Sequence, residues 1–325
     1  MDIILPSCWS PVKVFVPWFA SLIMHRVMVV GASGLLGQHM MSAGKEMGLA
    51  MTGTYNTVNA GIPGSIQMDI TDADSVSRGM EAACPELLVL CAAMTNVDQC
   101  EREPDAAYKV NMEGSFNVAA ECRSAGVKMV YISTDYVFNG LKGARYHEFE
   151  PADPLSIYAM SKLEGERVTL DGSRNNLVCR VSVVYGWNRL NRKSNFVTWM
   201  VDSLRKGQEV RLYNDQFVSP TYAPAAARDI LELGLSRIKG IVHTSGPDCL
   251  SRYDIGMMVA EVFGLDASLI KAVSTAEMPL LAKRPARSCL GVDLAESELG
   301  RPMTSLRQGL EMMRESERSA LVYER

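Results

Sequence analysis

The residues best suited to proton chemistry are Tyr158 and Lys162, which are one helical turn apart in the segment YAMSK. Residues four apart project from one face of a helix. The ordinary pKa of a tyrosine phenol is about 10, and an adjacent ammonium lowers that pKa by favouring the phenolate. Thr134 ends the upstream apolar run MVYIS, and its hydroxyl can join the same donor cluster. We therefore predict that Thr134, Tyr158 and Lys162 hold and protonate a carbonyl oxygen, although a lone YxxxK is commonly a surface pair.

A glycine-rich loop, GASGLLG, directly follows the apolar run VMVV and opens a helix-like segment. Gly31 permits a tight turn, Gly34 lets the backbone approach a pyrophosphate, and Gly37 allows close packing of helix on strand. The GxxGxxG spacing is typical of short-chain dehydrogenases. The alternative interpretation is a glycine-rich turn without a ligand. The loop residues that we expect to contact a dinucleotide are Gly31, Ser33, Gly34, Leu35, Leu36 and Gly37.

The residues expected near the adenosine do not decide between NAD and NADP as the cofactor. The second predicted strand ends at Thr54-Tyr55-Asn56, where NAD-specific proteins usually carry an acid and NADP-specific proteins a basic group. Neither is present, so we predict NADPH or NADH, with weight against strict NAD specificity and with Asn56 as a contact. Asp69 and Ile70 follow the third predicted strand and can meet the adenine, but an acid near a helix N-terminus, before the Asp72 cap, is an equally good interpretation of Asp69.

The elements that must hold these residues alternate between short apolar runs and segments of helical period. This alternation predicts an α/β fold, a doubly wound Rossmann-type parallel sheet with helices on both faces. The expected strands are 27–31, 50–54, 65–68, 87–91, 128–133 and 176–181, and the expected helices are 35–47, 73–83, 104–125 and 155–170. Most of the crossovers are long enough for right-handed βαβ units.

The alternation ends after Gly186, where a mixed region with helices near 196–206, 224–236, 253–263 and 305–314 is expected. We predict an NAD(P)-binding Rossmann domain at 24–186 with a returning segment at about 222–245. A smaller substrate-binding lobe is expected at 187–221 and 246–325. Residues 1–23 are apolar but interrupted by Pro17, and we interpret them as an extension ahead of a natural start at Met24, the alternative being a weak membrane-surface anchor.

Composition excludes several classes of partner. The chain has 325 residues and a formal net charge of -4 without long runs of one sign, which disfavours a nucleic-acid partner. We expect no integral membrane partner. Its eight cysteines never form a CxxC pair and its four histidines lack ligand spacing. We therefore predict reduced thiols, a cytoplasmic location and no metal site.

Longer strings resemble the dTDP-4-dehydrorhamnose reductase family of extended short-chain dehydrogenases. They are STDYVF at 133–138, PADPLSIYAMSKLEGE around Tyr158, NDQF at 214–217 with SPT at 219–221, and RPARS at 284–288. The resemblance spans about Met24 to Met313. It implies reduction of the C4 keto group of a dTDP-linked 6-deoxyhexulose by NADPH or NADH, with Tyr158 delivering the proton and Lys162 holding the nicotinamide ribose.

The same resemblance implies further contacts. Asn111 is expected to steady the active-site lysine, and Cys91, Ala92, Ala93 and Ser182 to lie near the cofactor. The expected contacts to the sugar and its diphosphate are Thr134, Asp135, Tyr136, Asn195, Gln216, Arg284 and Arg287. The family commonly has a tryptophan where this chain has Val183, so a related nucleotide sugar is an open alternative. Family members often form homodimers, and we expect one here.

Two other functions resemble this pattern. Nucleotide-sugar dehydratases place a glutamate where this chain has Tyr136, and a tyrosine cannot serve as that base at neutral pH unless strongly perturbed. Nucleotide-sugar epimerases remain open, although NDQ and RPARS favour a reductase. The regulatory beta subunit of methionine adenosyltransferase shares the loop and helix motifs. The alternatives are thus an epimerase or dehydratase, or a non-enzymatic regulatory subunit.

Overall fold

The structure, a computed structural model, describes residues 25–323 apart from 58, 60 and 192. Both interpretations of residues 1–23 therefore fall outside the described residues. Along the described part of the chain no helix is long and apolar enough to cross a membrane. Within those same residues no group of three or more His, Cys, Asp or Glu side chains is arranged to hold a metal ion.

The centre of the molecule is a seven-stranded parallel sheet with strand order β11-β6-β5-β4-β1-β2-β3. Its strands are β1 (Arg26–Val30), β2 (Ala50–Tyr55), β3 (Ile66–Gln67), β4 (Leu87–Leu90), β5 (Lys128–Thr134), β6 (Leu177–Val181) and β11 (Gly240–His243). All four residues of β4 and all five of β6 are buried, as expected for strands covered on both faces. The predicted doubly wound Rossmann-type fold is thus confirmed.

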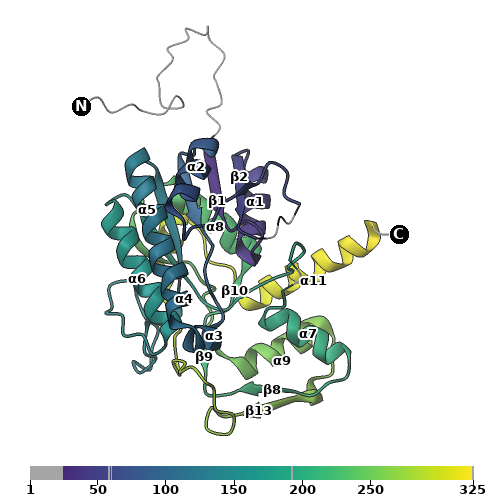
Figure 1. Cartoon of the computed structure of the whole chain (residues 1–325). Coiled ribbons are helices and arrows are strands. Elements are labelled where there is room, and N and C mark those ends of the chain that lie inside the picture. The colour runs from purple at the N-terminus through teal and green to yellow at the C-terminus, as the bar shows by residue number, and fades with distance from the viewer. Residues whose placement is uncertain (1–24, 58, 60, 192, 324–325) are drawn as a thin grey trace, which may run out of the picture.

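Helices cover both faces of this sheet (Figure 1). One face packs against α1 (Leu35–Glu46) and α8 (Ala223–Leu235) through a core that includes Met40 and Ile230. The other packs against α2 (Ala73–Ala83) and α5 (Gly114–Ala125), with α6 (Ile157–Gly172) beside α5. The smaller helices are α3 (Val97–Arg102), α4 (Pro104–Tyr108) and α10 (Asp293–Leu299).

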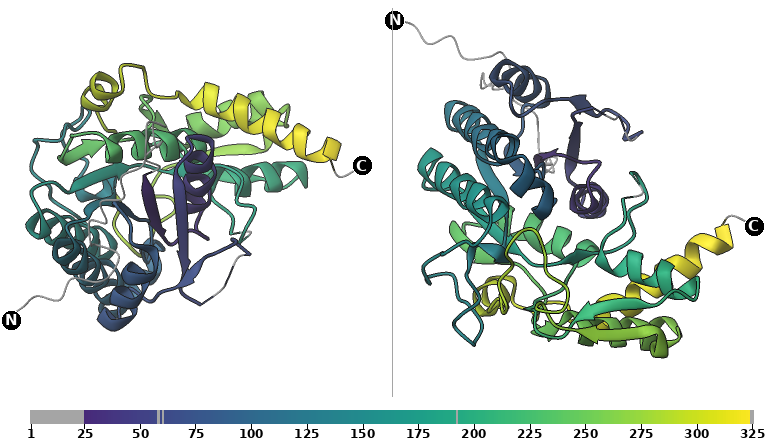
Figure 2. Two further views of the ribbon diagram at one scale, coloured as in Figure 1. Left: turned by 90° about the horizontal axis from the view of Figure 1, so that it is seen from above. Right: turned by 60° about the horizontal axis from the view of Figure 1, so that its bottom comes forward.

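A second group of elements lies beyond the carboxyl ends of the central strands, below the sheet in Figure 1 and in the lower part of the right-hand view of Figure 2. Its helices are α7 (Phe196–Arg205), α9 (Arg252–Phe263) and α11 (Leu306–Tyr323), and its strands are β7 (Val184–Tyr185), β8 (Val210–Tyr213), β9 (Phe217–Val218), β10 (Thr221–Tyr222), β12 (Leu250–Ser251) and β13 (Ile270–Val273). They share a separate core that includes Met200, Leu212 and Ile255. We call this group the small lobe.

Two predicted helices have different bounds. The segment 104–125 is not one helix: a π-helical turn, Lys109–Glu113, separates α4 from α5. Such turns bend a helix locally and are frequent at functional sites. The helix expected from residue 155 begins at Ile157, because the Ser156 side chain caps it by accepting a hydrogen bond from the Ala159 N–H. The periodicity did not reveal the short helices α3 and α10.

The prediction that the cysteines are reduced is wrong for one pair. Cys249 and Cys289 form a disulfide with their Cα atoms 5.4 Å apart. The two are 40 residues apart in the chain, so no local spacing announces the pair, and only the fold brings them together. Cys91, Cys100, Cys122 and Cys179 are free thiols, as expected.

Candidate active site

A cavity of about 970 Å³ opens at the carboxyl ends of β1, β4 and β5. This is the point where the strand order reverses, and ligands of doubly wound sheets bind there. Thirteen of the sixteen residues predicted to bind the cofactor line the cavity: Gly31, Gly34, Leu35, Leu36, Gly37, Asn56, Asp69, Ile70, Cys91, Ala92, Ala93, Tyr158 and Lys162. The other three, Ser33, Asn111 and Ser182, do not line it.

The glycine-rich loop has the geometry of a phosphate cradle. Gly31 has φ +87°, and a Cβ there would lie 2.9 Å from the Ala92 backbone nitrogen. A Cβ on Gly37 would overlap the Gly31 carbonyl oxygen. Gly34 is the N-cap of α1, and no side chain caps that terminus. The first N–H groups of α1 therefore face the cavity without a side-chain partner, which suits an anionic pyrophosphate.

The far side of the cavity is polar but carries few charges. Asn56 and Thr57 line it after β2, Thr71 lines it after β3, and Lys109 lines it from the π-helical turn. Asp69 also accepts hydrogen bonds from the Thr71 N–H and hydroxyl, both 2.9 Å long. Asp72 caps α2 by accepting from the Asp74 N–H. Asp69 thus combines the two interpretations of its role, because it shapes the turn before α2 and also faces the cavity.

Thr134, Tyr158 and Lys162 meet at the inner end of the cavity. Thr134 ends β5. Tyr158 and Lys162 lie one turn apart on α6. Lys162 is only 3% exposed and donates from Nζ to the Ile132 carbonyl oxygen at 2.6 Å. Its ammonium lies 4.0 Å from the centre of the Tyr131 ring. The three predicted residues therefore share one polar corner of the cavity.

The electrostatics of this corner correct one expectation. Burial raises the pKa of the Tyr158 phenol above its ordinary value, while a hydrogen bond with Thr134 opposes the rise. The predicted lowering by Lys162 is wrong for this arrangement, because Lys162 is turned to the Ile132 carbonyl. Burial also lowers the pKa of Lys162 to about 7, although the nearby Glu166 carboxylate opposes this shift by favouring the charged ammonium. A neutral phenol is consequently the dominant form of Tyr158 at neutral pH.

A buried ion pair lies behind the lysine on the same helix. The carboxylate of Glu166, four residues after Lys162, receives 2.8 and 2.7 Å hydrogen bonds from Arg180 on β6. Ser133 donates to the same carboxylate at 2.5 Å. Both members of the pair are at most 3% exposed. These bonds fix α6 against β5 and β6, so they hold the face of α6 that carries Tyr158 and Lys162.

Asn111 contacts the helix of the catalytic pair instead of the cavity. It lies in the π-helical turn and donates to the Ser161 hydroxyl at 3.0 Å. Its side-chain oxygen accepts from the Met94 N–H at 2.8 Å. Ser161 immediately precedes Lys162, so Asn111 ties α6 to the loop after β4. Asn111 does not line the cavity, and its role toward the cofactor stays a prediction.

Asp135 was predicted to bind substrate, but its carboxylate is already satisfied inside the protein. It is 2% exposed and accepts hydrogen bonds from Ser182 at 2.8 Å and from Ser288. The Thr134 hydroxyl lies 3.3 Å from its other oxygen. Burial raises the pKa of Asp135 to about 6 in spite of these donors. Asp135 and Ser182 therefore join the ends of β5 and β6 to the segment around Ser288, and neither lines the cavity.

The remaining predicted substrate contacts are divided. Asn195 lines the cavity, and its side-chain oxygen also caps α7. Tyr136 lies edge-on to Tyr158 with 6.3 Å between ring centres. Gln216 is 3% exposed and donates to Thr275. Residues of this set that do not line the cavity are Asp135, Tyr136, Gln216, Arg284 and Arg287.

Both predicted arginines have partners within the protein. Arg284 forms an ion pair with Asp98, its Nη2 lying 2.9 Å from Oδ2. The Arg287 guanidinium lies 4.1 Å from the centre of the Phe217 ring. A third arginine, Arg252, was missed by the sequence reasoning: it donates to the Tyr136 hydroxyl at 3.2 Å. No motif marked Arg252, because its contact depends on the meeting of α9 with the end of β5.

The sequence reasoning also missed a segment of the chain that borders the phosphate loop. Asn188, Asn191, Lys193 and Ser194 line the cavity. Asn191 donates to the Ser33 carbonyl oxygen at 2.7 Å. Gln38 on α1 donates to the Asn188 side chain and accepts from the Arg189 N–H. These bonds attach the start of the small lobe to α1 and the phosphate loop. No pattern in the sequence predicted them.

Comparison with known proteins agrees with this architecture. A family model described as the RmlD substrate binding domain matches residues 24–318. The chain is 34% identical over 87% of its length to a probable low-salt glycan biosynthesis reductase of Haloferax volcanii, covering 95% of that protein. It is 31% identical over 85% of its length to a dTDP-4-dehydrorhamnose reductase of Aggregatibacter actinomycetemcomitans, covering 94% of that protein.

A name other than reductase also occurs among the relatives. The chain is 30% identical over 84% of its length to methionine adenosyltransferase 2 subunit beta of Pongo abelii, covering 82% of that protein. Among solved structures, a Bacillus anthracis dTDP-4-dehydrorhamnose reductase in complex with NADP aligns with a TM-score of 0.81 and 29% identity, covering 90% of this chain and 99% of that one. A match of this extent in both sequence and fold assigns the chain to the RmlD substrate-binding-domain family.

Proposed function

We propose that the chain reduces the C4 keto group of a nucleotide-linked 6-deoxyhexulose with NADPH or NADH. The observation that carries the proposal is the position of Thr134, Tyr158 and Lys162 at the inner end of a cavity that begins at a phosphate-binding loop. The cavity residues fit a dinucleotide, because Gly31 and Gly37 leave space that a Cβ would fill. The similarity to dTDP-4-dehydrorhamnose reductases supports the reaction class.

The residues of the chain account for the proton half of the reaction. A nicotinamide cofactor, when bound, supplies hydride to the carbonyl carbon. Tyr158 gives its phenolic proton to the carbonyl oxygen, and its raised pKa keeps that proton in place at neutral pH. Thr134, whose hydroxyl is already within reach of Tyr158, hydrogen-bonds the same oxygen. Lys162 supplies positive charge at the base of the site and a donor for a ribose hydroxyl.

Within this class we propose dTDP-4-dehydrorhamnose as the substrate, which gives dTDP-rhamnose. The similarity to reductases of that name supports this choice. Val183 lines the cavity, at a position where the family resemblance implies a tryptophan, and a smaller side chain leaves a wider sugar pocket. A related keto sugar nucleotide is therefore the first alternative substrate to assay.

The proposal is tested by turnover with dTDP-4-dehydrorhamnose formed in situ, with NADPH and NADH each supplied in turn. We expect oxidation of at least one cofactor, and we expect Tyr158→Phe to lower kcat by at least about 100-fold, since it removes the proton donor. The variant should keep the parent's affinity for the cofactor. Absence of turnover across a panel of keto sugar nucleotides contradicts the proposal.

A second candidate is a regulatory subunit, which the similarity to methionine adenosyltransferase 2 subunit beta favours. Addition of the purified chain to a methionine adenosyltransferase distinguishes the two functions. A change in that enzyme's kinetics, together with no keto-sugar turnover, supports the subunit. An epimerase would instead interconvert a nucleotide sugar without net consumption of cofactor, and chromatographic separation of the nucleotide sugars after incubation detects this.

The organisation around this activity is also part of the proposal. We infer a cofactor domain at 24–186 with a returning segment at about 222–245, and a substrate lobe formed by 187–221 and 246–325. We also propose that the protein is cytoplasmic and forms a homodimer. Sedimentation of the purified chain tests the dimer, and a monomer at micromolar concentration contradicts it.

A further inference from the structure

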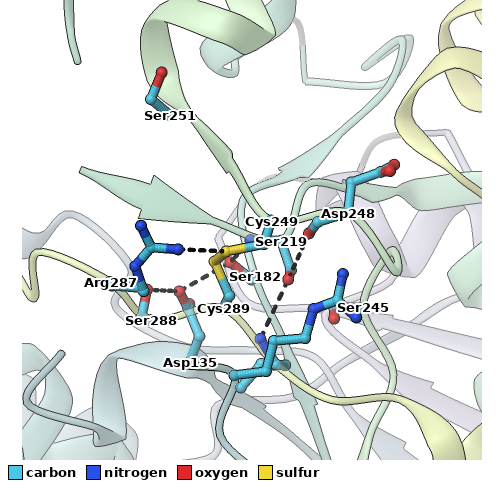
Figure 3. Close-up of a disulfide and its surroundings, with 12 residues drawn as sticks. Asp135, Ser182, Ser219, Ser245, Asp248, Cys249, Ser251, Arg287, Ser288 and Cys289 are labelled. Carbon is cyan, nitrogen blue, oxygen red and sulfur yellow. Dashed lines mark hydrogen bonds between the residues drawn. A yellow bond between two sulfur atoms is a disulfide. The ribbon is translucent and has the colours of Figure 1, made fainter. Parts of the chain in front are cut away.

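The disulfide between Cys249 and Cys289 joins the segment before β12 to the segment around Ser288, and it lies close to Asp135 and Arg287 (Figure 3). Cys249 immediately precedes β12 and α9, the helix that carries Arg252. Cys289 belongs to a segment that pairs with β9: the Phe217 N–H donates to the Ala286 carbonyl oxygen at 2.7 Å and the Ser288 N–H to the Phe217 carbonyl oxygen at 3.0 Å. The bridge therefore links the start of α9 to the strand-like segment 286–290.

Hydrogen bonds connect this bridge to the catalytic corner. Ser288, the neighbour of Cys289, donates to the Asp135 carboxylate. Asp135 in turn lies 3.3 Å from the Thr134 hydroxyl, which is hydrogen-bonded with Tyr158. Arg287, on the other side of Ser288, donates to the Cys249 sulfur at 3.5 Å. Movement of residues 287–289 consequently changes the contacts of Thr134, but it touches none of the residues that line the phosphate loop.

The surroundings of the two sulfurs suit both the bridged and the open state. Cys289 is fully buried, whereas Cys249 is partly exposed, so a thiol reagent reaches the bridge from the Cys249 side. After opening, the Arg287 guanidinium beside Cys249 stabilises the thiolate. A stabilised reduced form makes a disulfide easier to open.

We propose that Cys249 and Cys289 are a reversible thiol–disulfide modification site that controls the substrate half of the active site and leaves the cofactor half unchanged. In the opening step a dithiol attacks the bridge, the S–S bond breaks, and two electrons and two protons pass to the cysteines. The dithiol leaves as its cyclic disulfide. The inference rests on the proposed reductase function, and the bridged form is the active one.

The test compares the full-length protein before and after treatment with dithiothreitol without denaturant. Alkylation followed by mass spectrometry reports the state of Cys249 and Cys289. We expect reduction to lower kcat/KM for dTDP-4-dehydrorhamnose about tenfold, mainly through KM, while the Kd for NADPH changes by less than about twofold. Oxidised glutathione should restore the original values.

Two variants separate this effect from general loss of structure. Cys249→Ser with Cys289→Ser should behave like the reduced protein whether or not dithiothreitol is present, and its NADPH affinity reports that the fold is intact. Cys122→Ala, which alters a buried free thiol on α5, should respond to dithiothreitol as the parent does. If the double variant fails to fold, the reduced parent protein provides the same comparison.

The outcomes distinguish this inference from the proposed function. Equal kcat/KM in the bridged and reduced forms overturns the inference and leaves the reductase function standing. If neither form turns over a keto sugar, the reductase function fails, and binding of dTDP is then compared in the two forms. Weaker dTDP binding after reduction, at unchanged NADPH affinity, still supports the site, and equal binding overturns it.

Discussion

Val183 shows how the backbone shapes the substrate wall of the cavity. Among the described residues other than glycine, only Val183 and Cys84 have a positive φ, and that of Val183 is 39°. A β-branched residue in this region is strained, at a cost of about 1–3 kcal/mol. The Thr221 N–H holds the conformation by donating to the Val183 carbonyl oxygen at 3.2 Å. The strain lies where the side chain meets the cavity, as is common at functional sites.

Replacement of Val183 by glycine should therefore be tolerated. Glycine accepts the positive φ, so we expect Val183→Gly to change the free energy of unfolding by less than about 1 kcal/mol. The matched control is Val184→Gly in the adjacent strand β7, which loses a partly buried side chain and gains no relief of strain. It should cost about 1–2 kcal/mol in urea unfolding. Equal losses in the two variants contradict the strain argument.

Lys162 should destabilise the fold in a pH-dependent way. Its pKa is lowered by burial from 10.5 to about 7, so between these values the unfolded chain holds a proton that the folded chain lacks. Stability from this group therefore rises as the pH rises from 7 to 10.5, and its full cost applies below pH 7. We expect Lys162→Met to be more stable than the parent by about 2 kcal/mol at pH 6, after allowance for its lost hydrogen bond.

Urea unfolding of the parent and Lys162→Met at pH 6 and pH 10 measures this. The advantage of the variant should shrink towards pH 10, where the parent lysine is neutral in the folded state. A variant that is less stable than the parent by the same amount at both pH values contradicts the prediction. Cofactor-dependent turnover should be lost at both.

At the residue scale, the sequence predicted the corner of the site better than its surroundings. Thr134, Tyr158 and Lys162 meet as expected because short-range spacing on one strand and one helix determines their positions. Asp135 and Arg284 were predicted to contact substrate. In the structure Asp135 accepts hydrogen bonds from Ser182 and Ser288, and Arg284 forms an ion pair with Asp98. Those partners are distant in the chain, and no local pattern identifies them. The catalytic and binding roles of the predicted site residues stay predictions until variants are measured.

At the scale of single elements, α1 has glycines at two tightly packed positions, Gly37 and Gly44, and their neighbours differ. A Cβ on Gly37 would overlap the backbone of Gly31 in the phosphate loop, which has no room to move. A Cβ on Gly44 would meet only the side chain of Met51, which is flexible. The two glycines therefore separate a requirement of the cofactor site from ordinary packing of the same helix.

We expect Gly37→Ala to weaken NADPH binding at least tenfold and to lower the free energy of unfolding by about 2 kcal/mol or more. Gly44→Ala should cost under about 1 kcal/mol, because alanine favours the helix and Met51 can rotate. Its NADPH affinity should match that of the parent. Fluorescence titration with NADPH and urea unfolding provide both quantities. Similar NADPH affinities in the two variants contradict the assignment of Gly37 to the cofactor site.

The regular elements were predicted where their period was clear. The six predicted strands and the helices near α1, α2 and α6 are all present, because buried parallel strands and amphipathic helices leave strong patterns. The π-helical turn at Lys109–Glu113 was not predicted, since one extra residue in a helix barely changes its period. The short strands of the small lobe were missed for the opposite reason: two-residue strands carry no period.

At the scale of the whole molecule, the cavity lies between the hydrophobic core of the central sheet and that of the small lobe. One set of clusters surrounds the central sheet, and another fills the small lobe. Hydrogen bonds between Trp187 and Met313 and between Tyr185 and Leu306 strengthen the small lobe where it meets the sheet. The cavity is bordered by both groups, so its ligand should stabilise both together.

We therefore expect one unfolding transition, which NADPH shifts as a whole. At a concentration of 100 times its Kd, the cofactor should add about 2.7 kcal/mol to the free energy of unfolding and raise the melting temperature by roughly 5 °C. Calorimetry with and without NADPH measures this. Two separate transitions, of which NADPH moves only one, would instead indicate lobes that unfold independently.

The pairing of β7 with β10 has a mechanical consequence. The chain leaves the central sheet through β7 and returns to it through β10, and the two strands are parallel, with Val184 paired to Thr221 and Tyr185 to Tyr222. Two crossings joined by hydrogen bonds resist twisting more than a single tether does. Because the chain also crosses between the sheet and the small lobe after β11 and on either side of α10, this ribbon is one of several connections, and together they should make the two groups move as one body.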